Sequence, residues 1–157
     1  MATTNDLTDR FAAFLDAHHV FSLATAGLQG PHATNLLYAR DGLALLWVSD
    51  PSSRHSIELE GNEQVAATIA ADYAEYSQIQ GLQICGRAHR IIEMTERTRA
   101  RVLLETRYSF LKRSAEGSSA VRAIYAQSQI YRLDPVRMIL IDNSLGFGHK
   151  DILELGS

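Results

Sequence analysis

The sequence is poor in cysteine, in proline and in long apolar runs. Its 157 residues include one cysteine, Cys85, so the chain can form neither an internal disulfide nor a cysteine-built zinc site. The longest unbroken apolar run, Leu43 to Val48, is far shorter than the ~20 residues that span a bilayer. No basic stretch leads into an apolar one near the N-terminus. We therefore expect a cytoplasmic protein with no membrane partner.

Several motifs that carry enzyme chemistry are also missing. The chain has no Gly-x-x-x-x-Gly-Lys phosphate loop, no paired-histidine helix of the metalloprotease kind and no Gly-x-Ser-x-Gly nucleophile elbow. The six histidines are not paired with carboxylates at a spacing that is diagnostic of a metal site. We expect no metal centre, and a reaction that depends on such a motif is excluded.

The charge of the chain is unevenly distributed. The net charge is −3, but residues 87–122 carry nine basic and four acidic residues. Within this stretch Ala100, Leu104 and Tyr108 recur at helical spacing, while Arg97, Arg101 and Glu105 follow one another at i, i+4 on another side. A solvated helix face explains this pattern, and we expect no nucleic-acid partner.

The pattern of elements indicates one domain over residues 1–157. A chain of this length buries roughly 70% of the surface that its unfolded form exposes, enough for a core of its own. We expect a helix at 5–18, a barrel over about 19–93 and 129–142, and helices at 95–108 and 114–127. Six strands without βαβ alternation predict a β-rich α+β fold, a six-stranded antiparallel barrel with flanking helices.

Three local signals refine this prediction. Asp41-Gly42 between two β-rich runs indicates a hairpin. Asp134-Pro135 interrupts the last long strand, where the missing N–H of proline predicts an edge or a bulge. Cys85 lies on a strand pattern, and we expect it to be a buried small apolar residue.

Two segments suggest binding chemistry. At 49–55 a strand ends and a short helix begins, so that free N–H groups, several hydroxyls and Arg54 converge in a way that suits a phosphate. Ordinary helix capping with Arg54 in solvent explains the same residues equally well. Near the C-terminus, Gly146 and Gly148 flank Phe147 and allow close backbone approach, although a turn anchored by Phe147 is the simpler interpretation.

These segments resemble the FMN-binding split-barrel proteins related to pyridoxamine 5′-phosphate oxidase. The pattern in that superfamily is a strand, a Ser-Arg-Lys triplet, then Glu-Leu and an asparagine. Here Ser53 and Arg54 match the triplet, and His55 replaces its lysine. Glu58-Leu59 and Gly61-Asn62 follow in the expected order.

Within the superfamily the chain is most similar to the small bacterial YhbP-like branch. That branch also has an asparagine on the second strand, here Asn35, and a Gly-x-Gln on the long strand, here Gly81 and Gln83. It shares the terminal pattern Asp-Asn-x-Leu-Gly-Phe-Gly-x-Lys, which occupies 142–150. The similarity extends from about residue 19 to residue 150.

The resemblance implies a split-barrel homodimer that holds FMN between its two chains and acts as an oxidoreductase on an unidentified small molecule. It assigns Ser49, Ser53, Arg54 and His55 to the FMN phosphate, and Ala33, Thr34, Asn35 and Gln83 to the region of the isoalloxazine ring. Phe147 and Lys150 are added to the site as a hypothesis, the lysine as a second partner for an anion. Tyr38, Trp47, Tyr76 and Phe147 are candidates for the surface that faces the substrate, and each is equally well explained as core.

The chain also departs from the oxidase itself. The second-strand arginine that helps to hold the phosphate is replaced by Thr34, and the Gln-Val-Arg pattern of the substrate strand becomes Gly81-Leu82-Gln83. The C-terminal Arg-Leu-x-Pro ending is missing. We therefore do not expect oxidation of vitamin B6. A non-catalytic flavin- or haem-binding module, and a structural or regulatory protein with an empty cavity, are the alternatives.

Overall fold

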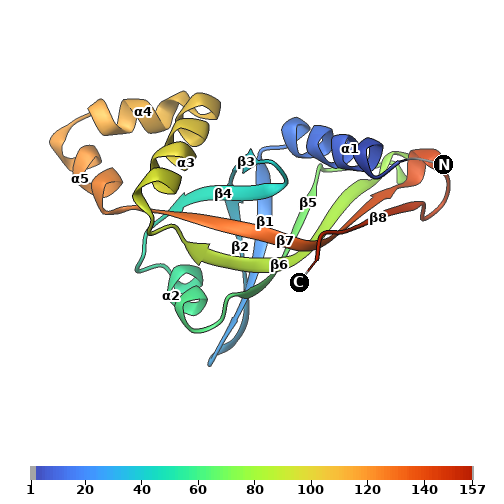
Figure 1. Cartoon of the computed structure of the whole chain (residues 1–157), viewed down its shortest axis with the longest axis horizontal. Helices are drawn as coiled ribbons and strands as arrows, with labels where there is room; N and C mark the ends of the chain where they lie inside the picture. Colours follow the sequence, from blue (N-terminus) through green and yellow to red (C-terminus); the bar gives the residue numbers. More distant parts are fainter. Residues whose placement is uncertain (1–2, 157) are drawn as a thin grey trace.

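A computed structural model describes residues 3–156 of the chain (Figure 1). In this part the strands are β1 (Val20–Gly27), β2 (Gly30–Leu37), β3 (Ala39–Asp41), β4 (Ala44–Ser49), β5 (Gln64–Ala70), β6 (Gln80–Arg90), β7 (Gln129–Asp142) and β8 (Lys150–Glu154). The helices are α1 (Thr4–Ala17), α2 (Arg54–Gly61), α3 (Met94–Arg107), α4 (Ser109–Glu116) and α5 (Ser119–Gln127), with 3-10 turns η1 (Tyr76–Gln78) and η2 (Asn143–Leu145). None of the helices described is long and apolar enough to cross a membrane.

The strands form one curled antiparallel sheet, a half-barrel in the order β2-β1-β5-β6-β7-β4-β3. The long strand β7 pairs with β6 on one side, and its other side is shared between β4 and β8. The predicted fold class, an α+β split barrel with flanking helices, is confirmed. The described sheet has eight strands rather than the predicted six.

Both additional strands have a local cause. The β-rich run that precedes Asp41-Gly42 divides at Tyr38, because β2 pairs with β1 whereas β3 turns away to pair with β4. The predicted hairpin at Asp41-Gly42 is confirmed, with Gly42 at φ +61°. The second addition is β8, which follows the glycine-rich turn and pairs with the end of β7.

The helix predicted at 114–127 is wrong in its extent, because two short helices occupy this part of the chain. α4 ends at Glu116, and the side chain of Ser118 accepts a hydrogen bond from the Val121 N–H to begin α5. A Cβ atom at Gly117 would lie 3.2 Å from the carbonyl oxygen of Arg113, so the corner between the helices is tight. The helices predicted at 5–18 and 95–108 are confirmed as α1 and α3, whose ends lie within one residue of the predicted bounds.

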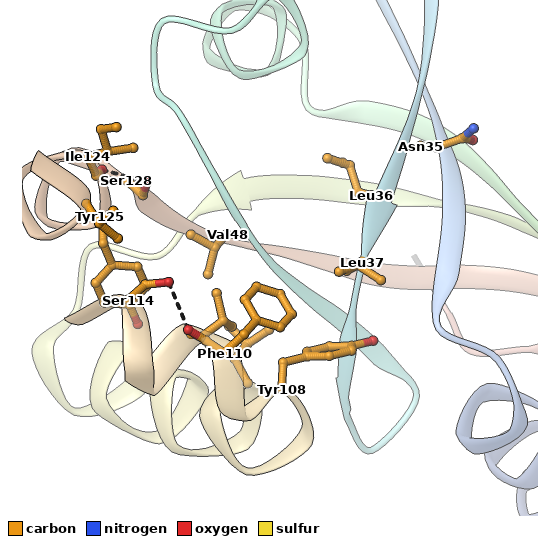
Figure 2. Close-up of a pocket in the computed structure, with 13 residues that line it drawn as sticks. Asn35, Leu36, Leu37, Val48, Tyr108, Phe110, Ser114, Ile124, Tyr125 and Ser128 are labelled. Atoms are coloured by element: carbon orange, nitrogen blue, oxygen red, sulfur yellow. Dashed lines mark hydrogen bonds between the residues drawn. The ribbon is translucent and has the colours of Figure 1, made fainter. Parts of the chain in front are cut away.

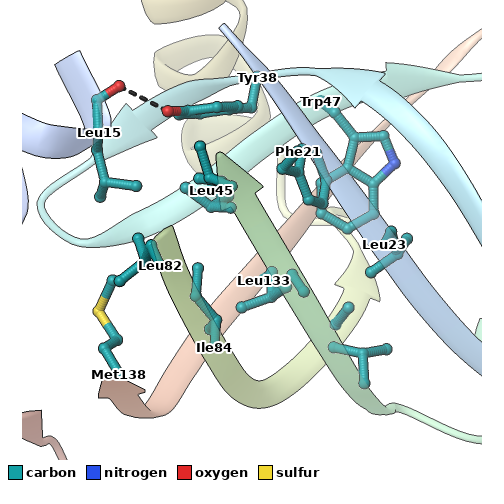
Figure 3. Packing of buried hydrophobic residues seen from close by; sticks show 14 of the residues in the cluster. Leu15, Phe21, Leu23, Tyr38, Leu45, Trp47, Leu82, Ile84, Leu133 and Met138 are labelled. Carbon is teal, nitrogen blue, oxygen red and sulfur yellow. Dashed lines mark hydrogen bonds between the residues drawn. The ribbon is translucent and has the colours of Figure 1, made fainter. Parts of the chain in front are cut away.

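The main core lies inside the curl of the sheet and is closed at one end by α1. Leu15 from α1 is fully buried there, and Tyr38 donates a 2.6 Å hydrogen bond to the Leu15 carbonyl (Figure 3). Trp47 stacks on Tyr131 and meets the edge of Phe21. Tyr38 and Trp47 are therefore core residues and do not face a substrate.

A bulge in β7 allows this one strand to fill two parts of the core. Pro135 pairs with Gly86 and Arg137 with Cys85, so that Val136 is the extra residue. Tyr131 and Leu133 point inward before the bulge, but Met138 and Leu140 point inward after it, a change from odd to even positions. The bulge predicted at Asp134-Pro135 is confirmed.

A second, smaller core joins α3 to the sheet. Leu104 of α3 packs there with Leu46 and Ile130. The guanidinium of Arg107 donates to the backbone carbonyls of Asp16 and His18, which end α1, and the Tyr108 hydroxyl donates to the Tyr38 carbonyl at 2.6 Å. These contacts fix α3 and the start of α4 beside β2.

Candidate functional site

The turn between β4 and α2 is held by Asp50. Its carboxylate accepts hydrogen bonds from the Ser52 N–H and the Ser52 hydroxyl, both at 2.7 Å. The N–H of Ser53 donates to the Asp50 carbonyl at 3.1 Å. This Asx-type turn places Ser53 at the N-cap of α2 in an extended conformation. The short helix predicted here is confirmed.

Three of the predicted phosphate residues meet at the start of α2. The Nε2 atom of His55 lies 2.7 Å from the Ser49 hydroxyl and 3.1 Å from the Ser53 hydroxyl. The Ser53 hydroxyl also lies 2.8 Å from the hydroxyl of Ser56. Ser53 makes no side-chain capping bond to the helix. The N–H groups of the first turn of α2 therefore have no side-chain acceptor among residues 3–156.

His55 is buried in this cluster, and burial lowers the pKa of its imidazole. The neighbouring His32 lowers the pKa further, and the Glu58 carboxylate opposes the shift. The folded protein therefore favours the neutral imidazole. The contribution of His55 to the free energy of unfolding is present above the unfolded pKa of about 6.5 and is lost as the pH falls below it.

We expect the free energy of unfolding to fall as the pH is lowered from 7.5 to 5, and His55→Asn to remove part of that slope. The reason is that the folded protein resists the proton that the unfolded chain accepts. Urea denaturation at several pH values measures it. His89→Asn is the control, because His89 is a half-exposed histidine near the end of β6. Its replacement should keep the pH dependence of the free energy of unfolding that is due to His55. An unchanged slope in His55→Asn would contradict the buried neutral imidazole.

Arg54 lies on the exposed side of the same helical turn. Its Nε donates to Glu58 Oε1 at 2.8 Å, and an Nη atom approaches the Gly30 carbonyl at 3.3 Å. Thr25 donates to the other oxygen of Glu58 at 2.5 Å. The hydrogen bond from Thr25, followed by that from Arg54, lowers the pKa of Glu58. Arg54 is thus held against the β1–β2 hairpin with its side chain 39% exposed.

The second-strand residues divide between the two faces of β2. Ala33 pairs with Ala24 and Asn35 with Ser22, so both point away from the main core, on what we call the outer face of the sheet. Thr34 pairs with Leu23, a core residue, and points to the inner face. The three neighbours that were assigned to the isoalloxazine region therefore do not share one surface.

The outer face carries a polar row that crosses four strands. Successive register pairs place the following residues side by side: Asn35, Ser22, Thr68 and Gln83. The Ser22 hydroxyl donates to Asn35 Oδ1 at 2.5 Å. Next to it runs a row of small side chains: Ala33, Ala24, Ala66 and Cys85. Cys85 is exposed in this row, so the prediction that it is buried is wrong.

Phe147 and Lys150 lie at the other end of the sheet, in and after the turn that joins β7 to β8. Lys150 pairs with Ile141 and is exposed on the outer face. Phe147 is 85% exposed and packs on Tyr76 with ring centroids 5.2 Å apart. Figure 1 shows this turn at the right-hand end of the molecule and α2 well apart from it at the lower left. Within one chain, neither residue meets the serine–histidine cluster.

The sequence interpretation missed a cavity between β2 and the helices. It has a volume of about 360 Å³ and is bounded by Leu37 of β2, Val48 of β4 and side chains of α3, α4 and α5 (Figure 2). Of the predicted site residues only Asn35 lines it. A groove of about 810 Å³ lies beside the β1–β2 hairpin, with Arg54 in its wall. The amphipathic pattern of 109–127 could have indicated the apolar wall of the first cavity.

Comparison with known proteins gives a consistent result. The model of the family described as pyridoxamine 5′-phosphate oxidase matches residues 7–141. The chain is 29% identical over 140 residues to a UPF0306 protein of Photorhabdus laumondii, covering 87% of this chain and 88% of the relative.

Solved structures share the fold. A haem-binding protein of Mycobacterium smegmatis superposes with a TM-score of 0.69 at 20% identity, over 98% of this chain and 59% of that one. The chain thus spans little more than half of this relative. A protein of Listeria innocua described provisionally as a pyridoxamine 5′-phosphate oxidase gives a TM-score of 0.66 at 20% identity, over 85% of this chain and 97% of that one. The haem storage protein HutZ of Vibrio cholerae gives a TM-score of 0.63 at 16% identity, over 81% of this chain and 88% of that one.

Proposed function

Because the chain belongs to the pyridoxamine 5′-phosphate oxidase family, we propose that it binds FMN and is an oxidoreductase for a small molecule. The observation that carries the proposal is the start of α2. There the first-turn N–H groups lack a side-chain acceptor within residues 3–156, and the hydroxyls of Ser49 and Ser53 lie beside them. Free N–H groups at the positive end of a helix dipole bind phosphate.

The residues present fit the phosphate end of FMN. Ser49 offers a hydroxyl donor, and the Ser53 hydroxyl, which donates to the Asp50 carbonyl at 2.8 Å, would turn to the phosphate; the Nε2 atom of His55 lies within hydrogen-bond distance of both hydroxyls. The neutral imidazole replaces the lysine of the superfamily pattern, so Arg54 would be the cation that faces the phosphate. Bound FMN would supply the electron-transfer chemistry, and the protein would bind and orient it.

The outer face supports the proposal of a homodimer. Its small side chains at Ala24, Ala33 and Ala66 leave room for a second surface or a planar ring to approach closely. Gln83 and Lys150 also lie on this face. A second copy packed on the outer face would bring such residues toward its partner's α2, so that each FMN would contact both chains.

We also assign the chain, within its family, to the YhbP-like branch. The terminal pattern of that branch has a structural role in this chain, since Asn143 donates to the Tyr76 carbonyl at 3.1 Å and accepts from the Gly148 N–H at 3.0 Å. Gly146 and Gly148 have φ values of +136° and +67°, which favour glycine. The pattern thus specifies the turn that presents Phe147. A cytoplasmic location and the absence of a nucleic-acid partner remain predictions.

A non-catalytic flavin- or haem-binding module is the second candidate, favoured by the fold that the chain shares with the haem-binding protein of M. smegmatis and the haem storage protein of V. cholerae. A histidine that ligates a haem iron must offer a free imidazole nitrogen. The Nε2 atom of the buried His55 instead contacts Ser49 and Ser53. This geometry favours FMN over haem at α2.

Cofactor titration distinguishes the candidates. We expect the purified protein to take up FMN, one per chain, with a change in the visible absorption of the flavin, and to release FMN on denaturation. Reduction of the bound flavin by NADH or NADPH, and its reoxidation by an added acceptor, would separate an enzyme from a carrier. Uptake of haem in preference to FMN would support the second candidate. Uptake of neither would contradict both.

We expect Arg54→Ala to weaken FMN binding by about 1.5 to 3 kcal/mol, the scale of a hydrogen bond to a charged partner. Fluorescence titration of FMN measures the dissociation constant directly. Arg122→Ala, which removes an exposed arginine from α5, is the matched control and should leave the affinity unchanged. Equal affinities in all three proteins would show that Arg54 points to solvent when FMN binds.

A further inference from the structure

The cavity between β2 and the helical segment has the form of a small-molecule site. It lies against the edge of β2 that is not paired with β1, and Val48 and Tyr108 bound it on the side of the sheet and α3 (Figure 2). Phe110 of α4 and Ile124 of α5 bound the opposite side. Its volume of about 360 Å³ falls within the ~300–1,000 Å³ that is typical of ligand pockets.

The lining of this cavity is uncharged. None of the lining residues in the described part of the chain is Lys, Arg, His, Asp or Glu. The hydroxyls that line it are all engaged within the protein, in Tyr108, Ser114, Tyr125 and Ser128. Such a lining offers a phosphate or carboxylate no cation, and burying an unpaired charge there is costly.

One polar group remains available to a ligand. The Oδ1 atom of Asn35 accepts from Ser22, while its Nδ2 donates to no residue in the range 3–156. Asn35 also belongs to the polar row of the outer face. It therefore stands between the cavity and the face on which the flavin ring is proposed to lie.

The helices α4 and α5 beside the cavity bury none of their side chains. Ile124 is 69% exposed, and Phe110 and Val121 are each 42% exposed, although all three line the cavity. Apolar side chains that surround a concave space of this volume match a small apolar molecule better than the surface of another protein, which needs roughly 800 Å² on each partner.

We propose that this cavity is the substrate site, and that it selects a neutral, largely apolar ring compound whose one hydrogen-bond acceptor meets the Asn35 amide. Its role as a substrate site rests on the proposed flavin function. Binding of the ring compound does not depend on the flavin function, because every residue that lines the cavity belongs to the protein itself. Phosphorylated substrates of the vitamin B6 kind are excluded from the cavity by its lack of charge.

Two probes of matched shape test the proposal by equilibrium dialysis on the full chain, with and without FMN. 2-Acetylnaphthalene is neutral and has one carbonyl acceptor, whereas 2-naphthoate has a charged carboxylate in the same position. We expect saturable binding of the neutral probe, one per chain, and binding of the carboxylate weaker by about tenfold or more because its charge would be unpaired. Equal binding of the two probes, or no saturable binding, would overturn the proposal.

Two variants locate the bound probe. Ile124→Glu places a charge on the exposed wall of the cavity without removing a core side chain, and should weaken the neutral probe by about tenfold or more. Val102→Glu makes the same change on α3 outside the cavity and should bind like the original chain. If Ile124→Glu binds the probe normally, or instead dissociates a dimer in sedimentation velocity, the cavity is not a small-molecule site.

The outcome is independent of the flavin proposal. FMN affinity is measured on the same three proteins, and we expect Ile124→Glu to leave it unchanged. Probe binding in a protein that takes up no FMN would retain the cavity site and contradict the flavin function. FMN uptake without probe binding would retain the flavin function and contradict the cavity site.

Discussion

Replacing Gly86 with alanine is expected to lower the free energy of unfolding by about 3 kcal/mol, because a rigid backbone atom occupies the space that the new methyl group needs. A Cβ atom at Gly86 would lie 2.3 Å from the carbonyl oxygen of Asp134 and 3.1 Å from a methyl carbon of Leu133. The Asp134 oxygen is a backbone atom, and the Leu133 side chain is fully buried in the main core. The strand must therefore shift at the bulge, and urea denaturation measures the cost.

Gly81→Ala is the matched control on the same strand. Its Cβ atom would find the Ile69 carbonyl oxygen at 4.0 Å, an ordinary contact, so we expect a change within about 0.5 kcal/mol. Similar losses in the two variants would show that strand β6 responds to any added methyl group and that the bulge is not specifically constrained.

The consequence of the bulge extends to the candidate site. Because β7 changes the parity of its inward residues at Val136, Arg137 and Ile139 point to the outer face rather than into the core. Ile139 pairs with Gln83 and lies next to the end of the polar row. A strand shift at Gly86 should thus disturb the register of the outer face as well as the core, and FMN affinity should fall together with stability.

Much of the fold was readable from local signals. The strand pattern that contains Cys85 is β6, in which the buried Leu82 and Ile84 alternate with more exposed neighbours, and Asp134-Pro135 predicted an edge or a bulge. The same alternation places Cys85 on the face opposite to Ile84, but the general preference of cysteine for burial suggested the reverse. The preference failed because the outer face is exposed in a single chain.

The candidate site was predictable only where its residues are close in sequence. Ser49, Ser53 and His55 meet because one turn joins β4 to α2. The alignment of Asn35 with Gln83 depends on the register of four strands, which no local pattern specifies. The cavity depends on how α4 and α5 pack. Because 114–127 was predicted as one helix, the corner between α4 and α5 beside the cavity was not predicted.

The proposed FMN site combines residues at the start of α2 with residues on the outer face of a second chain. A variant that prevents self-association should therefore also affect FMN binding. Replacing Ala66 with arginine is expected to weaken a homodimer by about 100-fold or more, since a desolvated, unpaired charge at an interface costs several kcal/mol. Ala66 lies between Ala24 and Cys85 on the outer face and is exposed there, so the single chain can fold with the arginine in solvent.

Sedimentation velocity over a range of concentrations measures the dissociation constant of the dimer, and circular dichroism checks that the variant is folded. The control is Val102→Arg, the same charge on an exposed apolar position of α3, outside the row of Ala24, Ala66 and Cys85. Because FMN is proposed to contact both chains, Ala66→Arg should also bind FMN weakly although Arg54, Ser53 and His55 are intact. A monomeric original chain that binds FMN tightly would contradict the shared site, and a dimeric Ala66→Arg would place the interface elsewhere.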